Sequence, residues 1–138
     1  MIAPLSFVFS IDDPSFTSKL SIVNADCPYI AHAFVQTPIY DEATGNQIGY
    51  KVSDDYVQQV APHLYIVRLS NTYFFTDRGS ISWSYVFENN TNSYYYPSDV
   101  QVYSNIISGT GEFYGSSGTV RLFPSTDGTR TVQIIFNI

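Results

Sequence analysis

Residues 107–121 read ISGTGEFYGSSGTVR, a stretch with four glycines set among aromatic and hydroxyl side chains. Glycines at this spacing occur in phosphate-binding loops, in flexible linkers and at tight corners between strands. A phosphate-binding loop leads into a helix, whereas Gly118 is followed by the β-branched and aliphatic run TVRLF. A linker is excluded because Phe113 and Tyr114 interrupt the glycines and apolar runs flank both sides. The stretch therefore predicts a corner between two strands.

The predicted hairpin uses its glycines in two ways. Gly109 and Gly111 would supply positive φ at the corner, and Gly115 and Gly118 would relieve crowding where the strands coil. Phe113 would turn back and plug the end of a closed sheet. The two strands are expected over residues 100–108 and 117–123.

Alternation with a period of two recurs along the chain and predicts strands with one buried face. Turn signals rich in Gly, Pro, Asn and Asp separate these runs every 10–20 residues, which indicates an all-β fold with little or no helix. The alternating runs are 5–11, 63–75, 80–87 and 131–138.

Two segments depart from this pattern. Helical periodicity is best at 52–63, where Asp54 would cap a short helix and Pro62 would end it, although VQQV could equally be extended. The Asn- and Tyr-rich segment 87–99 is expected to be a loop with an aromatic patch.

The composition limits the classes of partner. Charged residues make up 13% of the chain against about 25% in typical soluble domains, so we expect a homo-oligomer, trimer or dimer, that hides part of the surface. The net charge is −6 and the six basic residues are scattered, so no nucleic-acid partner is expected. Cys27 is the single cysteine and excludes an intramolecular disulfide. Without a membrane span or secretory signal, we expect a soluble domain, 1–138, intracellular or associated with an assembly.

The glycine hairpin also resembles that of a known family. Residues 108–118, SGTGEFYGSSG, are similar to the GGTGxFxGAxG hairpin of plant dirigent proteins and allene oxide cyclases. Ser108 replaces the first Gly, Ser116 replaces the Ala, and Ser117 stands where dirigent proteins often carry a basic residue. Weaker resemblances lie upstream in the same order, at PIYDEATGNQIGY (38–50) and FFTDRGSISW (74–83), so that residues 36–138 are covered and 1–35 match nothing.

The resemblance implies an eight-stranded antiparallel β-barrel, trimeric in the family, with an apolar lumen. The family's activities, cyclisation of an allene oxide and steering of phenol radical coupling, use no metal and no covalent nucleophile, so no cofactor is expected. Both depend on a shaped apolar cavity with a few polar groups. In allene oxide cyclases these include a buried carboxylate and an Asn. We could not assign the family's site residues to this chain, because the matching stretches are turns rather than site-bearing strands.

Two carboxylate pairs and two histidines could carry acid–base or metal chemistry. Asp41-Glu42 lies in a predicted turn and Asp54-Asp55 at the possible helix start, so turn and cap roles are expected. His32 and His63 have no acidic or cysteine neighbour at ligand spacing. We predict no metal site and name no catalytic residue.

Six side chains are candidates for binding a ligand, in the lumen or in the loop 87–99. The arginine among them would anchor a carboxylate if its strand face lined the lumen, and would otherwise point outward and pair across strands. The tyrosine cluster could stack on a sugar or base, but we favour packing against protein. The candidates are Arg68, Trp83, Tyr85, Tyr94, Tyr95 and Tyr96.

We predict a non-enzymatic, oligomeric β-barrel that serves as a structural or protein-interaction module, because the barrel-forming turns occur without a recognisable catalytic set. The alternative is a lumen that binds or cyclises a small apolar molecule. A third hypothesis for the function is contact with a carbohydrate or a nucleic acid through the loop 87–99. A buried carboxylate facing an accessible cavity would favour the alternative, whereas an interior filled with aromatic side chains would exclude it.

Overall fold

The computed structural model describes residues 2–94, 100–125 and 127–137. The described residues form ten strands and one short 3-10 turn, η1. The elements are β1 Leu5–Ser10, β2 Thr17–Asn24, β3 Ile30–Asp41, β4 Gln47–Ala61, β5 Leu64–Phe75, β6 Gly79–Asn89, β7 Val102–Asn105, β8 Ser108–Gly109, η1 Gly111–Phe113, β9 Gly118–Pro124 and β10 Thr129–Phe136.

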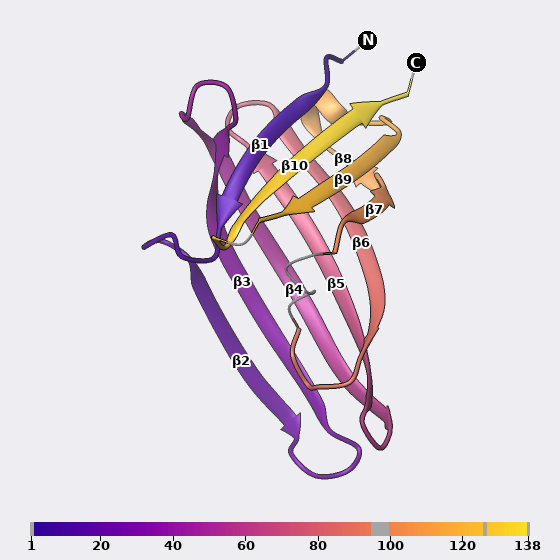
Figure 1. The fold of residues 1–138 in the computed structure, drawn as a ribbon. Coiled ribbons are helices and arrows are strands. Elements are labelled where there is room, and N and C mark those ends of the chain that lie inside the picture. Colours follow the sequence, from indigo (N-terminus) through magenta and orange to yellow (C-terminus); the bar gives the residue numbers. More distant parts are fainter. Residues whose placement is uncertain (1, 95–99, 126, 138) are drawn as a thin grey trace.

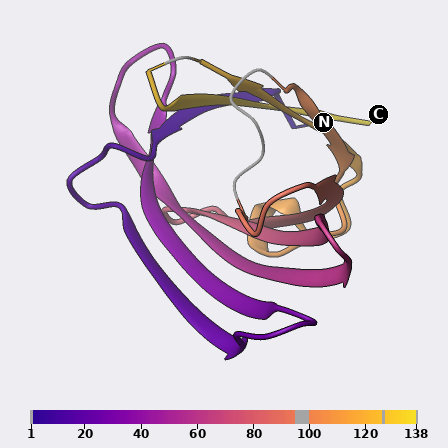
Figure 2. The same cartoon turned by 60° about the horizontal axis from the view of Figure 1, so that its bottom comes forward.

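The strands form one strongly curled antiparallel sheet in the order β7-β9-β10-β1-β3-β4-β5-β6-β8 (Figures 1 and 2). β7 and β8 follow each other closely in the chain and lie at the two ends of this order. β7 pairs with β9 and β8 pairs with β6, so the segment that contains both strands joins the two ends of the sheet. With β7 and β8 counted as one strand, eight strands curl around the interior. The all-β, antiparallel fold expected from the sequence is therefore confirmed, in the form of a half-barrel.

The strands close around the interior at one end of the half-barrel, and the interior is less enclosed at the other end because only the longer strands reach it. β1, β9 and β10 have six to eight residues, whereas β3 to β6 have 11 to 15 and extend well beyond them (Figure 1). There β2 pairs with the edge of β3 that β1 occupies further along. Of residues 1–35, unplaced by the sequence, the described part from residue 2 supplies one barrel strand, an added edge strand and the start of β3.

The alternating runs place their apolar phase inside, as predicted. Phe7 and Phe9 of β1 are buried, as are Val132, Ile134 and Phe136 of β10. The segment 52–63, our best helix candidate, is instead most of β4, so that prediction was wrong. Residues 52–58 pair with β3 on one side, residues 52–59 and 61 pair with β5 on the other, and hydrogen bonding to both neighbours outweighs a weak local helical preference.

The glycine hairpin is confirmed, with different roles for two of its glycines. Gly111 and Gly115 have positive φ, of 59° and 73°. Gly109 and Gly118 are instead places of close approach, where an added Cβ would lie 2.2 Å from the carbonyl oxygens of Phe113 and Ile135 respectively. Gly109 and Gly115 exchange their expected roles because η1, Gly111–Phe113, lies between them and makes the turn.

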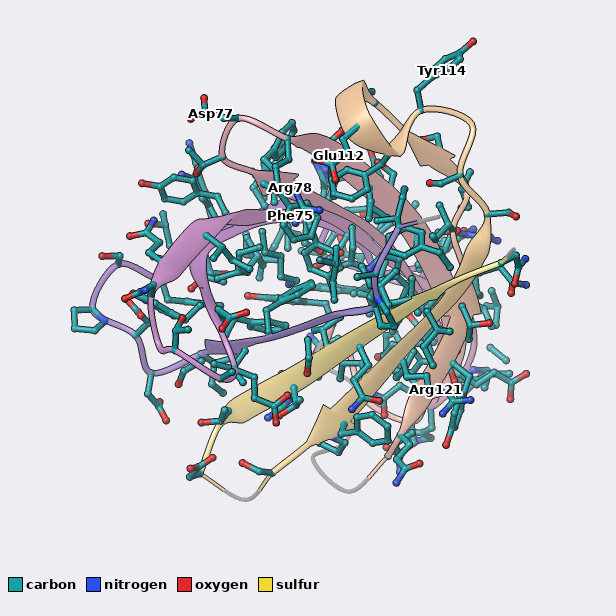
Figure 3. The ribbon with its side chains drawn as sticks, turned by 90° about the horizontal axis from the view of Figure 1, so that it is seen from above. Phe75, Asp77, Arg78, Glu112, Tyr114 and Arg121 are labelled. Atoms are coloured by element: carbon teal, nitrogen blue, oxygen red, sulfur yellow. The ribbon has the colours of Figure 1, made fainter. Side chains whose placement is uncertain are left out.

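Phe113 plugs one end of the interior, as predicted. Its side chain is completely buried, with ring centroids 5.3 Å from Phe75 and 5.9 Å from Phe136. Arg78 lies over the Phe113 ring and donates two hydrogen bonds to Glu112, of 3.0 and 2.7 Å. Figure 3 shows this pair side by side at the closed end, while Tyr114 projects away from the molecule.

We call the large buried cluster at this end of the interior the apolar end. It spans strands from both edges of the sheet and contains most of the buried aromatic side chains. Its members are Phe7, Phe9, Ile39, Tyr73, Phe75, Ile81, Trp83, Val102, Ile106, Phe113, Val120, Leu122, Val132, Ile134 and Phe136. A second, smaller cluster lies further along the long strands, at Val57, Val67 and Leu69.

No helix in the described part of the chain is long and apolar enough to cross a bilayer. The homo-oligomer and the lack of a nucleic-acid partner stay predictions.

Candidate functional site

Between the two apolar clusters, the inner face of the sheet carries a group of polar and charged side chains that we call the polar layer. It consists of Lys51, Ser53 and Asp55 of β4, Asn71 of β5 and Arg130 of β10. Each is at most 7% exposed. Lys51, Ser53 and Asp55 alternate along β4, so all three point to the interior. Charged residues are rarely buried this deeply without a structural or functional reason.

Strand register places the members of the polar layer around a common space. Asn71 lies directly opposite Ser53 across the β4–β5 ladder. Arg130 lies opposite Phe9 across the β1–β10 ladder, and the Nζ of Lys51 lies 4.7 Å from the centroid of the Phe9 ring. Phe9 therefore connects the two basic side chains, which come from opposite sides of the curled sheet.

The polar layer lines a partly open pocket with an accessible volume of about 20 Å³. This volume accommodates one water-sized molecule, and a larger guest requires side chains at its boundary to move. Tyr94, which precedes the undescribed residues 95–99, is one of these, and its hydroxyl contacts Ser18 Oγ of β2. The remaining walls, Phe9, Ile11, Phe16, Val35 and Leu69, are apolar.

Asp55 is a buried carboxyl group with a raised pKa. Burial raises its pKa from 3.8 to about 6. The hydrogen bond from Ser53 Oγ, the charge of Lys51 and a backbone hydrogen bond from Ser70 oppose this rise, and the neighbouring Asp54 adds to it. A group whose pKa lies this close to the operating pH is suited to general acid or base catalysis.

Lys51 is the second perturbed group of the polar layer. Burial lowers the pKa of its ammonium from 10.5 to about 8, the charge of Asp55 opposes this fall, and Arg130 adds to it. Strongly perturbed pKa values cluster at functional sites, and two perturbed groups here line one pocket.

Asn71 presents a buried hydrogen-bond donor to the pocket. It is 4% exposed, and in the described part of the chain its side-chain nitrogen has no hydrogen-bond acceptor. A buried amide donor without an acceptor costs about 1–3 kcal/mol, and in native structures it usually marks a water, ion or ligand. Since Asn71 lines the cavity, an acceptor oxygen placed there would satisfy it.

The six residues proposed from the sequence are spread over the molecule. Arg68 is exposed on the outer face of β5, opposite Tyr56 and Val86, so it is an outward side chain. Trp83 is buried in the apolar end and Tyr85 packs against it. Only Tyr94 lines the cavity, whereas Tyr95 and Tyr96 lie outside the described residues.

Sequence reasoning missed the whole polar layer. Asp54-Asp55 was assigned to a helix cap, but both residues lie in β4, and alternation sends Asp55 inward and Asp54 outward. The sequence did contain a signal for the polar layer. Asn71 and Arg130 lie in the inward-facing phase of their strands, two positions from the buried residues Leu69, Tyr73 and Val132. Polar residues in the apolar phase of an alternating strand mark such a layer.

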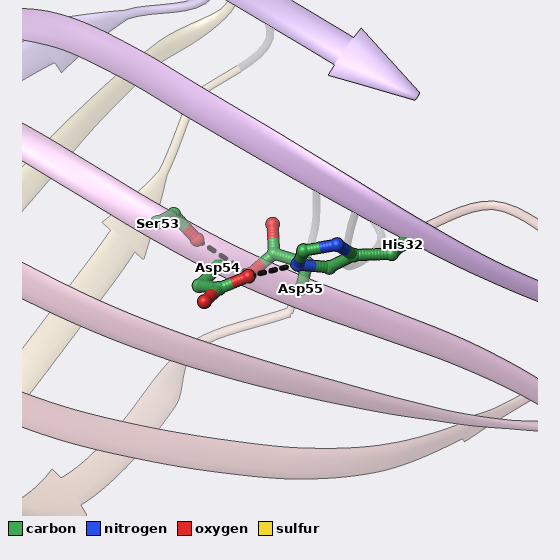
Figure 4. Close-up of polar contacts among 4 residues, drawn as sticks. All are labelled: His32, Ser53, Asp54 and Asp55. Carbon is green, nitrogen blue, oxygen red and sulfur yellow. Dashed lines mark hydrogen bonds and ion pairs between the residues drawn. The ribbon is translucent and has the colours of Figure 1, made fainter. Parts of the chain in front are cut away.

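The outer face of the same strand carries a separate contact. Asp54 contacts His32 Nε2, and the imidazole stacks on Tyr56 at 4.4 Å between ring centroids. Figure 4 shows this contact beside the hydrogen bond from Ser53 to Asp55. The two carboxylates involved, Asp54 and Asp55, are adjacent residues of β4. His63 lies in the β4–β5 turn with a φ of 59°. Within residues 2–94, 100–125 and 127–137, no three His, Cys, Asp or Glu side chains are placed to hold a metal ion.

Comparison with known proteins places the fold. No protein-family description and no curated protein matches the sequence. Among solved structures, a pyocyanin demethylase matches with a TM-score of 0.67 and 13% identity over 98% of this chain and 100% of its own. A pterocarpan synthase dirigent protein matches at 0.54 and 16% identity, over 97% of this chain and 86% of its own. AbnU, an exo-specific intermolecular Diels-Alderase, matches at 0.56 and 13% identity, over 96% of each chain.

These matches correct the predicted function. A non-enzymatic structural or interaction module was our main prediction, yet three proteins that share this fold are a demethylase, a synthase and a Diels-Alderase by name. Aromatic side chains fill the apolar end, as a closed interior would require, but beyond that end the buried carboxylate that would favour a ligand-binding lumen is present, as Asp55 on the wall of the pocket. The finding supports the alternative over the interaction module. The glycine hairpin was a true marker of fold, and this chain has the dirigent-like β-barrel fold.

Proposed function

We propose that the half-barrel binds a small, largely apolar molecule at the polar layer and acts on it by acid–base chemistry, with Asp55 exchanging the proton. The observation that carries the proposal is a buried carboxyl group with a pKa of about 6 on the wall of a small, partly open pocket. Buried charges reduce stability unless they are compensated, so they are expected where function requires them. Two proteins with this fold are named as enzymes, a demethylase and a Diels-Alderase, which supports an enzymatic function for this chain. The fold by itself does not assign a reaction.

The residues that line the pocket indicate what kind of molecule would bind there. Phe9, Phe16 and Leu69 favour an apolar body, and an aromatic or alicyclic ring would pack well against them. Lys51, Arg130 and Asn71 are hydrogen-bond donors and favour an oxygen acceptor or an anionic group at the other end. The guest would enter by displacing Tyr94 from its contact with Ser18, because the cavity itself holds no more than a water-sized molecule.

The test measures thermal unfolding of the full chain with a panel of small aromatic acids, phenols and ketones. A compound present at about 100 times its Kd stabilises the protein by about 2.7 kcal/mol, which raises Tm measurably. The stabilisation should be lost in Asp55→Asn and retained in Asp54→Asn, the matched control on the outer face of the same strand. Failure of every compound to bind, or equal binding by Asp55→Asn, would contradict the proposal.

The same panel tests the chemistry. Compounds that bind are incubated with the protein and followed by chromatography over a pH series. We expect conversion whose rate changes near pH 6 and is lost in Asp55→Asn, since proton exchange depends on the state of this carboxyl group. Binding without conversion of any compound would count against acid–base catalysis and leave a binding protein.

A further inference from the structure

Lys51 has an environment that a structural lysine rarely has. Its side chain is 7% exposed and lines the cavity from the middle of the polar layer. In the described part of the chain it forms no ion pair with a carboxylate, and the pairs found there are His32–Asp54 and Arg78–Glu112. A buried amine that faces a cavity without an ion-pair partner is available to react with a guest.

We propose that Lys51 is a nucleophilic amine that captures the carbonyl group of a small, anionic carbonyl compound as a Schiff base. The proposal rests on the proposed function in one respect only, that the cavity admits small molecules. It assigns to this site a covalent step that acid–base chemistry at Asp55 alone does not include.

The step balances without an oxidant or a reductant. The neutral Lys51 amine attacks the carbonyl carbon, a C–N bond forms, and a proton passes from nitrogen to oxygen to give a carbinolamine. The hydroxyl group leaves as water with a proton from the Asp55 carboxylic acid while the nitrogen lone pair closes the C=N bond. The remaining N–H proton returns to the Asp55 carboxylate, so one molecule of water is released and Asp55 is regenerated.

The other polar side chains define the anionic part of the substrate. Arg130 brings a second positive charge to the cavity wall, and it lies near enough to Lys51 to affect its ionisation. The unsatisfied amide nitrogen of Asn71 supplies a further donor. A carboxylate bonded to the carbonyl carbon would fit these donors while the carbonyl faces Lys51, which makes small 2-oxo acids the natural substrate class.

The ionisation of Lys51 supports this role. A pKa of about 8 leaves about a tenth of the amine neutral at pH 7, several hundred times the fraction for a lysine with the ordinary value of 10.5. Desolvated lysines of this kind form Schiff bases in other enzymes.

The experiment uses the full chain, glyoxylate as the probe and cyanoborohydride to reduce any imine to a stable secondary amine. Peptide mapping by mass spectrometry then compares the two lysines of the sequence, Lys51 and Lys19. Lys19 is exposed on β2 and is the matched internal control. At pH 7 we expect Lys51 to be modified at least about ten times faster than Lys19, and unfolding in urea to abolish the difference.

Two controls separate the possible causes. Acetaldehyde, which lacks the anionic group, should modify Lys51 more slowly than glyoxylate does. Lys51→Arg keeps the charge and should lose the adduct, but the internal comparison in the wild-type chain stands even if this variant fails to fold.

Equal or slower modification of Lys51 relative to Lys19 overturns the inference. If panel compounds still bind in an Asp55-dependent manner, the proposed function survives that result. If Lys51 reacts rapidly while no panel compound is converted, the inference stands and acid–base catalysis at Asp55 fails.

Discussion

The interior of the half-barrel changes character within a few residues of the same strands. On β5, Tyr73 and Phe75 belong to the apolar end, while Asn71, the next inward residue, belongs to the polar layer. The apolar end is sealed by Phe113 and by the Arg78–Glu112 pair, whereas the polar layer faces a cavity. Along β5, one end thus belongs to the apolar core, and the next inward position carries a polar side chain on the wall of the pocket.

The largest expected effect is at the apolar end. Phe113→Ala should destabilise the protein by about 3–5 kcal/mol, because it removes a completely buried ring that packs against Phe75 and Phe136. Urea unfolding measures this change. Tyr114→Ala, at the neighbouring residue that is 85% exposed, should change stability by less than about 0.5 kcal/mol. Similar losses in the two variants would show that Phe113 does not seal the interior.

A methyl group added at the apolar end is the next test. Gly118→Ala should cost about 1–3 kcal/mol, since its Cβ would lie 2.2 Å from the Ile135 carbonyl oxygen and β9 would have to move away from β10. Gly115→Ala should cost about 1 kcal/mol, from its positive φ alone, because nothing lies within 4 Å of an added Cβ. The free energies of unfolding rank the two, and a larger loss at Gly115 would contradict the close packing at Gly118.

The polar layer should be revealed by pH dependence. The pKa of Asp55 is raised on folding, so the folded state binds the proton more tightly, and stability from this group falls as pH rises from 3.8 through about 6. Between pH 5 and pH 8 this amounts to a loss of about 1.4 kcal/mol. Asp54→Asn should keep this loss and Asp55→Asn should remove it, as measured by urea unfolding at several pH values. Identical pH profiles for the two variants would mean that Asp55 titrates normally.

The smallest effect is expected at the rim of the apolar end. Glu112→Gln breaks the ion pair with Arg78, but both side chains are more than a third exposed, so the cost should be below about 1 kcal/mol. Adding salt should weaken the wild-type protein towards the variant. A loss of stability as large as that of Phe113→Ala would mean that the ion pair, rather than the buried Phe113 ring, closes this end of the interior.

Much of the apolar end could be read from local sequence. The glycines of 107–121 specify a corner, and Phe113 is an apolar residue that only a closed end could bury. The exact glycine roles were not accessible, because the place of the turn depends on η1 and on the approach of β10 to Gly118.

The polar layer was harder to predict for a physical reason. Whether Asp54 or Asp55 faces inward depends on the register of β4 with β3 and β5, and these pairings join residues far apart in the sequence. Asp also has low strand propensity, so VSDDYVQQV favoured a helix locally. Arg130 and Asn71 did carry a readable signal, since each occupies the apolar phase of an alternating strand.

The most direct test of the account is to map where a stabilising compound binds, using amide chemical shifts of the isotope-labelled full chain. If the polar layer is the site, the largest shift changes will fall on Ser53, Asp55, Asn71 and Arg130, and Asp55→Asn will abolish them. Changes confined to the outer face, around His32 and Tyr56, or changes that persist in Asp55→Asn, would contradict the central claim that the polar layer is where this half-barrel binds its substrate.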